Sequence, residues 1–222
     1  MSDNKLPRNP IIDRISLFQK DIKGKTVLHI GCTDYPLTKE KLEDHSLLHF
    51  DLMASAKSVT GIDLSEESIK IMADNGIDNV YCLDIYKLNE NKLLLENKFD
   101  FIIFSEVIEH LPNAGFALES LRKFITNTNK EAILIITAPN IHNFIFRIIE
   151  MFTNRETVHP DHYYYFSYRT LSKLLIDCGF KILDSKYVLY RKKSIIYKPF
   201  LWTMNLFTSS FIPYILFKCK IS

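Results

Sequence analysis

Short runs of β-branched and aromatic residues alternate with amphipathic stretches along most of this 222-residue chain. The run 101–104 contains only apolar residues, which is typical of a strand that is buried on both faces of a sheet. The stretches between such runs repeat apolar residues at helical spacing. Because strands that alternate with helices form parallel sheets covered on both sides, the sequence predicts an α/β fold with a doubly wound, mostly parallel sheet.

Capping signals place the helices of this fold. Thr38 is predicted to begin a helix that runs toward Leu52. Ser65 is predicted to cap a helix that ends at Gly76, and Ser167 to cap a later one. The expected strands, seven in all with the last one antiparallel, cover residues 26–30, 58–63, 80–83, 99–104, 132–137, 180–190 and 214–221.

The order of elements has no linker, repeat or low-complexity tract in it, so we predict a single domain. Residues 1–24 are expected to form an N-terminal helical cap and residues 25–190 the core. Residues 191–222 are expected to form an aromatic helix and the closing strand.

Composition excludes several classes of protein. The chain has 28 Lys and Arg against 26 Asp and Glu, with no basic stripe, so no nucleic acid partner is expected. Four cysteines lie far apart without a paired spacing, which indicates neither a disulfide framework nor a zinc knuckle. The first five residues lack the apolar core of a secretory signal, so we expect a cytoplasmic protein.

The segment 199–217 has no charged residue and is flanked by basic ones. Polar residues near its middle disfavour a spanning helix, and we expect a helix over 198–207 followed by a strand. The aromatic residues of 198–217 would also suit peripheral contact with a membrane surface or a homodimer interface.

Acidic residues follow two of the predicted strands, at the sheet edge where ligands bind in doubly wound folds. Asp63 ends the second strand, where a carboxylate commonly accepts hydrogen bonds from a ribose diol, and Asp84 follows the third. A dinucleotide is disfavoured, because the loop after Gly31 is poor in glycine. Asp63 also lies 32 residues after Gly31, against ~20 residues in the dinucleotide fingerprint. A nicotinamide-dependent oxidoreductase is therefore the less favoured reading.

Four segments taken together resemble the successive motifs of class I S-adenosylmethionine-dependent methyltransferases. They are Val-Leu-His-Ile-Gly-Cys at 27–32, Gly-Ile-Asp-Leu-Ser at 61–65, Leu-Asp at 83–84 and Phe-Asp-Phe-Ile-Ile-Phe-Ser-Glu-Val-Ile-Glu-His-Leu-Pro at 99–112. The likeness runs from about residue 25 to residue 179. It implies the Rossmann-like methyltransferase fold and S-adenosyl-L-methionine as cofactor.

The resemblance also implies which residues bind the cofactor. The loop 31–33 would lie beside its methionine part, Asp63 would hold the ribose hydroxyls, and Asp84 would accept from the adenine amino group. Ser105 would lie near the methionyl amine or the sulfonium. The cofactor-binding residues implied in this way are His29, Gly31, Cys32, Thr33, Asp63, Leu64, Asp84, Ile85 and Ser105.

The chain departs from the family pattern at three positions. His29 stands where the family usually has Asp or Glu, and Thr33 and Tyr35 stand where it usually has glycine. A side chain at either glycine position limits how closely backbone approaches a ligand. A non-catalytic relative that binds a partner or a membrane surface through its C-terminal aromatic segment is therefore the alternative function.

The loop after the fourth strand would face the transferable methyl group. An oxygen nucleophile needs a base near neutral pKa to remove its proton, which makes His110 the candidate base, oriented or charge-stabilised by Glu109. Alternatively, both residues only begin or cap a helix before Pro112.

A polar and aromatic cluster at 159–166 suits an acceptor pocket, with His159, His162, Tyr163 and Tyr165 as its candidate substrate residues. Alternatively, its tyrosines cover the sheet as scaffold. The two histidines have metal-ligand spacing, but no third ligand stands at a meaningful spacing, so no metal is predicted.

The sequence thus favours a methyltransferase that acts on a small-molecule acceptor through oxygen or, less favoured, nitrogen. A sugar or a secondary-metabolite intermediate would fit such an acceptor.

Overall fold

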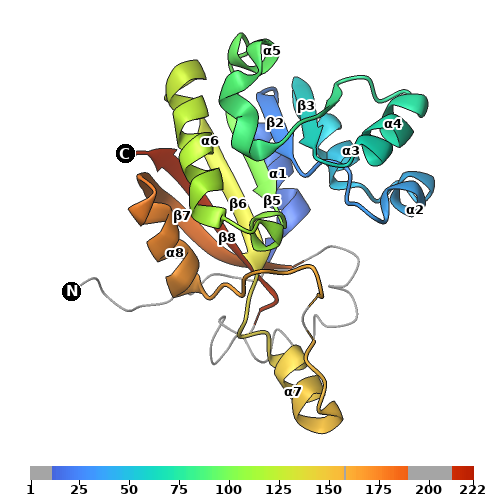
Figure 1. Ribbon diagram of the computed structural model, residues 1–222, viewed down its shortest axis with the longest axis vertical. Coiled ribbons are helices and arrows are strands. Elements are labelled where there is room, and N and C mark those ends of the chain that lie inside the picture. The colour runs from blue at the N-terminus through green and yellow to red at the C-terminus, as the bar shows by residue number, and fades with distance from the viewer. Residues whose placement is uncertain (1–11, 158, 190–211) are drawn as a thin grey trace.

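The computed structural model describes residues 12–157, 159–189 and 212–222, and one eight-stranded sheet forms its centre (Figure 1). Seven strands correspond to the predicted ones, and the eighth is a two-residue edge strand before the first helix. The strands are β1 (Ile12–Asp13), β2 (Thr26–Ile30), β3 (Ser58–Asp63), β4 (Val80–Cys82), β5 (Phe101–Ser105), β6 (Ile133–Pro139), β7 (Phe180–Leu189) and β8 (Tyr214–Ile221).

The sheet order is β1-β7-β8-β6-β5-β2-β3-β4. β8 runs antiparallel to both β6 and β7, whereas all the other neighbouring strands are parallel. This confirms the predicted doubly wound, mostly parallel sheet with an antiparallel last strand. The carboxyl ends of β2 to β6 therefore share one edge of the sheet.

Helices cover both faces of the sheet (Figure 1). One face packs against α6 and α8 and the other against α1 and α3. The helices are α1 (Arg14–Ile22), α2 (Thr38–Glu43), α3 (Leu48–Met53), α4 (Glu66–Asp74), α5 (Lys92–Leu95), α6 (Ala114–Thr128), α7 (Phe144–Thr153) and α8 (Tyr168–Asp177), with 3₁₀ helices η1 (Ile85–Glu90) and η2 (Ile108–His110).

Central strands alternate their side chains between these two helical layers. On β5, Ile102 and Phe104 lie in the core under α6, while Phe101 and Ile103 lie in the core under α1 and α3. All four side chains are buried, because successive residues of a strand point to opposite faces. The uninterrupted apolar run is thus explained by a strand with a core on each side.

The predicted caps at Ser65 and Ser167 are confirmed, since each hydroxyl accepts a hydrogen bond from the backbone nitrogen three residues later. The single helix predicted from Thr38 toward Leu52 is wrong. The chain forms α2 and α3 instead, with Leu37 as the residue before α2. His45 takes a φ of 51°, and the turn it makes lets the following residues enter the core.

The helix expected over 198–207 lies outside the described residues, as does most of the segment 198–217 proposed for membrane or dimer contact. Among the helices that the structure describes, none is both long and apolar enough to cross a bilayer.

Gly61 on β3 offers a test of packing beneath the sheet edge. A Cβ atom at Gly61 would lie 2.7 Å from the Cys32 sulfur and 2.9 Å from Cε1 of His49. We expect Gly61→Ala to lower the free energy of unfolding by about 1–3 kcal/mol, as overpacking does. Chemical denaturation monitored by circular dichroism measures this change.

The matched control is Gly115→Ala in α6, where the added Cβ would be 3.8 Å from the nearest atom. This change should leave stability unaltered or raise it by up to about 1 kcal/mol, because alanine favours helix. Equal stability losses in the two variants would contradict the packing argument.

Candidate active site

Backbone hydrogen bonds join the loop after β2 to the end of β3. The amides of Gly31 and Cys32 both donate to the Ile62 carbonyl, at 2.9 and 3.2 Å. The Asp63 carboxylate accepts from the amide of Thr33 at 3.1 Å through Oδ2. Its Oδ1 accepts from the Ser65 amide at the same distance. Each carboxylate oxygen has a further lone pair, so Asp63 is held in place and can still accept two hydroxyl donors.

The neighbouring residues add an apolar surface and a second acid. Leu64 is 71% exposed, so its side chain presents an uncovered apolar surface directly after Asp63. The Leu83 amide donates to the Asp63 carbonyl at 2.8 Å, which places Asp84 beside β3. Asp84 accepts from the Tyr86 amide at 2.9 Å, and Ile85 is buried. The edge thus combines acids for hydroxyl or amino donors with an apolar surface for a ring.

Neither of the two altered glycine positions has a backbone that needs glycine. Positive φ occurs at Gly31, with 76°, and at Asp34, with 57°, whereas Thr33 and Tyr35 have ordinary φ. Aspartate tolerates this left-handed conformation better than most residues. Thr33 is fully buried, so its side chain packs in the interior, whereas Tyr35 is 65% exposed and its side chain lies in solvent.

His29 and Cys32 lie in the interior beneath this loop. The ring of His29 stacks on His49 of α3, with the centroids 5.4 Å apart and the two Nδ1 atoms 3.1 Å apart. Burial lowers the pKa of His29 well below its ordinary value and raises the pKa of the Cys32 thiol. Both residues are thus neutral packing partners of the loop.

The loops after β2 and β5 are in direct contact. A Cβ atom at Gly31 would lie 2.2 Å from a methyl carbon of Val107, so only glycine leaves room for the Val107 side chain. This contact fixes the position of the loop after β5 relative to the acidic edge, by which we mean the sheet edge that carries Asp63 and Asp84.

A buried arginine reaches the end of β5 from the N-terminal helix. Arg14 donates from Nη1 to Ser105 Oγ at 2.7 Å and lies 3.7 Å from Glu106 Oε1. Ser105 also exchanges a hydrogen bond of 2.7 Å with Thr137 of β6, and Thr137 donates to Glu106 at 2.6 Å. Ser105 therefore belongs to a buried polar network, with Arg14 and Glu106 as members that the sequence reasoning missed.

A signal for Arg14 was present in the sequence. Arg14 stands three and four residues before Leu17 and Phe18, and all three are buried on the same face of α1. An arginine on the apolar face of a helix indicates a buried partner. Glu106 was harder to predict, because the feature that marks it, a left-handed φ of 57°, is visible only in the structure.

Two carboxyl groups of the loop after β5 are largely removed from water, since Glu109 is buried and Glu106 is half-buried. Burial raises the pKa of Glu106, and the nearby Arg14 guanidinium opposes this shift. Burial also raises the pKa of Glu109 well above its ordinary value, and the Glu106 carboxyl raises it further. Glu109 Oε2 has no hydrogen-bond partner among the described residues.

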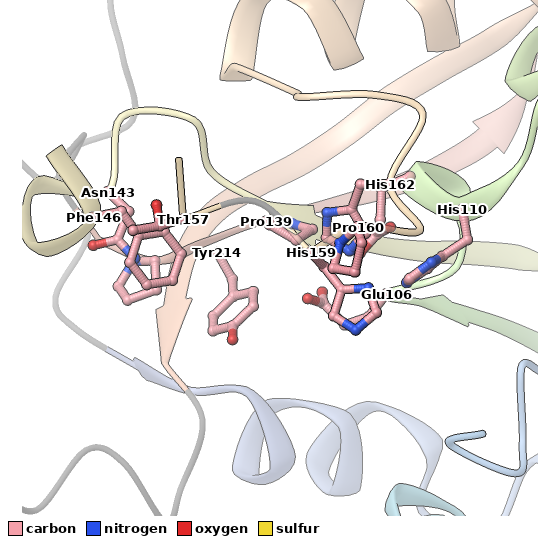
Figure 2. A pocket seen from close by; sticks show the side chains of 12 residues that line it. Glu106, His110, Pro139, Asn143, Phe146, Thr157, His159, Pro160, His162 and Tyr214 are labelled. Atoms are coloured by element: carbon pink, nitrogen blue, oxygen red, sulfur yellow. The ribbon is translucent and has the colours of Figure 1, made fainter. Parts of the chain in front are cut away.

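A cavity of about 470 Å³ lies beside this loop (Figure 2). Figure 2 shows histidines from two segments gathered at one end, with Phe146 of α7 and Thr157 at the other. Its lining residues are Glu106, Glu109, His110, Pro139, Asn143, Phe146, Thr157, His159, Pro160, His162, Pro213 and Tyr214.

Three histidines meet in this cavity. The ring centroids of His110 and His162 are 4.5 Å apart, and His159 lies 5.8 Å from His110 and 5.3 Å from His162. Burial lowers the pKa of His110 and lowers that of His162 to about 4, so both rings are neutral at neutral pH. The spacing argument missed the third histidine because His110 comes from a distant loop.

The predicted tyrosines occupy different places. Tyr163 is 66% exposed and lines a smaller cavity of about 330 Å³ with His110 and His162. Tyr165 is half-buried, and its hydroxyl has no hydrogen-bond partner among the described residues. The structure therefore brings His110, Glu109, His159 and His162 into one cavity, with Tyr163 at its side.

The chain is similar to known methyltransferases in sequence. A ubiquinone biosynthesis O-methyltransferase of Nitrosomonas europaea is 25% identical over 122 residues, which are 53% of this chain and 46% of that protein. The chain spans about half the length of the curated relatives it matches.

Solved structures share the fold. A methyltransferase of Archaeoglobus fulgidus that depends on S-adenosylmethionine superposes with a TM-score of 0.57 at 19% identity, over 93% of this chain and 91% of that one. The 1,6-didemethyltoxoflavin-N1-methyltransferase of Burkholderia thailandensis, solved with S-adenosylhomocysteine, gives 0.55 at 14% identity, over 94% and 78%.

A family model described as a methyltransferase domain matches residues 5–185, which include the acidic edge and the three histidines of the cavity. The predicted resemblance is thereby confirmed, and the chain belongs to the methyltransferase domain family.

Proposed function

We propose that this protein transfers a methyl group from S-adenosylmethionine to an oxygen of a small-molecule acceptor. One observation carries the proposal: the loop after β5 touches both the acidic edge, through Val107 against Gly31, and the three-histidine cavity, through His110. A cofactor at the edge and an acceptor in the cavity would then meet at this loop.

The cofactor half of the site rests on the residues at the ends of β2, β3 and β4. Asp63 would accept from the ribose hydroxyls, Leu64 would cover the adenine, and Asp84 would accept from its amino group. The exposed apolar surface of Leu64 and the fixed carboxylate of Asp63 fit this group. Carboxylates rather than a phosphate cradle suit a cofactor that carries an ammonium and a sulfonium.

The acceptor half of the site lies in the cavity of His110. When bound, S-adenosylmethionine supplies a methyl carbon to which the acceptor oxygen bonds, while the carbon–sulfur bond breaks with its electron pair on sulfur. His110 takes the hydroxyl proton, because a half-buried ring with a lowered pKa is unprotonated at neutral pH. Glu109 beside it is buried and holds the histidine-bearing segment through its backbone carbonyl.

The acceptor class follows from the cavity and from the relatives. A base and two further imidazoles around a cavity of about 470 Å³ suit a hydroxyl on a small molecule. The curated relatives are named as O-methyltransferases, which favours oxygen over nitrogen. A sugar or a secondary-metabolite intermediate remains our proposal for the class of acceptor.

The non-catalytic alternative rested on Thr33 and Tyr35. Since the backbone at both positions has ordinary φ, their side chains do not by themselves indicate a collapsed cofactor loop. We therefore favour the catalytic reading.

Substitution of Asp63 tests the proposed cofactor-binding half of the site. We expect Asp63→Ala to weaken the binding of S-adenosylhomocysteine by roughly 10- to 100-fold, the loss of hydrogen bonds to a charged acceptor. Isothermal titration measures the dissociation constant. Asp63→Asn, which keeps the size of the side chain, should weaken binding in the same direction.

Asp74→Ala, which removes an exposed acid at the end of α4, is the control and should leave binding unchanged. The absence of any binding of S-adenosylhomocysteine to the unaltered protein would refute the proposed function.

Substitution of His110 tests the proposed acceptor-binding half of the site. We expect His110→Gln to lower methyl transfer from methyl-labelled S-adenosylmethionine to a panel of small phenols and sugars by about 10²- to 10⁴-fold. Its affinity for S-adenosylhomocysteine should stay the same, because His110 lies in the acceptor cavity. An unaltered protein that binds the cofactor yet methylates nothing in the panel would instead support the non-catalytic alternative.

A further inference from the structure

His110, His159 and His162 offer three ligand atoms that all lie within 4.8 Å of one another. Imidazole nitrogens bind zinc at ≈ 2.0–2.1 Å, so small ring rotations would bring all three to a common ion. Two of the rings are half-buried and all three line one cavity. Figure 2 shows them converging on the same end of that cavity from two separate segments.

Backbone hydrogen bonds, and not only the side chains, hold these segments together. The His162 amide donates to the His159 carbonyl at 3.0 Å, and this turn places the two rings side by side. The next residue, Tyr163, donates its amide to the Glu109 carbonyl at 2.8 Å. The Tyr164 hydroxyl donates to the Pro112 carbonyl at 3.0 Å. His110 is thus fixed opposite the turn by the contacts of its own neighbours.

Two acidic residues complete the surroundings of a cation site. Glu109 is 1% exposed and lines the same cavity, and its Oε2 has no hydrogen-bond partner among the described residues. Asp161 lies beside His159. Its amide donates to His159 Nδ1 at 3.3 Å, and its carboxylate lies 3.7 Å from the same nitrogen. A carboxylate or carbonyl behind a histidine commonly orients the ring of a metal ligand.

We propose that His110, His159 and His162 bind one divalent transition-metal ion, with Zn²⁺ as the reference ion. Three imidazoles suit zinc and its first-row neighbours, whereas Mg²⁺ and Ca²⁺ prefer sites made only of oxygen. Three protein ligands also leave a fourth coordination position open toward the cavity, as in catalytic zinc sites.

The role of the ion, unlike its binding, rests on the proposed function. An acceptor hydroxyl at the open position would lose its proton more readily, because a bound cation lowers the pKa of a coordinated oxygen. His110 would then serve as a ligand in place of serving as the base.

The experiment uses the full chain without a histidine tag, first freed of metal with a chelator. Titration with Zn²⁺ against a chromophoric chelator should give one equivalent per chain. Co²⁺ should give the visible absorption of a tetrahedral nitrogen site. His110→Gln, His159→Gln and His162→Gln should each weaken Zn²⁺ binding by more than the roughly 10- to 100-fold that loss of an outer partner costs.

The matched control is His45→Asn. It removes an exposed histidine at the end of α2, and asparagine tolerates the left-handed φ there. Its Zn²⁺ affinity should equal that of the unaltered protein. Thermal unfolding followed by circular dichroism confirms that each variant is folded.

Unaltered protein that binds Zn²⁺ no better than folded His162→Gln would overturn the proposal. Tighter binding of Mg²⁺ than of Zn²⁺ would also overturn it, since imidazoles would then not be the ligands. Titration of S-adenosylhomocysteine on the same samples keeps the two proposals separate. Zn²⁺ binding without S-adenosylhomocysteine binding would support the metal site and count against the methyltransferase function.

Discussion

The parallel register of the central strands is the constraint on which the site depends. Hydrogen bonding between β2 and β3 pairs Ile30 with Ile62, so the next residues of both strands emerge side by side. β5 pairs with β2 on one side and with β6 on the other. Acids separated by tens of residues are therefore neighbours at one edge, where ligands of doubly wound folds bind. The buried apolar strands fix this register, because a slip by one residue would exchange the two cores.

The side chains of the loop after β5 contact three different parts of the molecule. Glu106 meets Arg14, Val107 fills the space beside Gly31, and His110 enters the three-histidine cavity. The left-handed backbone at Glu106 helps to separate these directions. One short segment thus contacts the N-terminal helix, the acidic edge and the acceptor cavity. A displacement of this segment at one of these contacts would also displace its side chains at the other two.

The fold was predictable because its signals are local. Alternating apolar runs gave seven strands, and the serines at 65 and 167 marked helix starts that the structure confirms. The break between α2 and α3 was not predictable in this way, since it depends on the positive φ of His45. The site was only partly predictable. Motif order located the acids, whereas Arg14 and the meeting of His110 with two distant histidines depend on tertiary packing.

The polar groups beneath the site are costly for stability, which itself favours a functional role. Arg14 is 2% exposed and lies with Glu106 and Ser105 under the end of β5. Removing two charges from water costs several kcal/mol per ion, and apolar residues of similar size are often as stabilising or more so. Charged groups retained in such a place are common at functional sites. Because Arg14 belongs to α1, this helix contributes to the polar floor of the site as well as to the core. The site is therefore built from segments far apart in the sequence, among them α1 and the turn between His159 and His162.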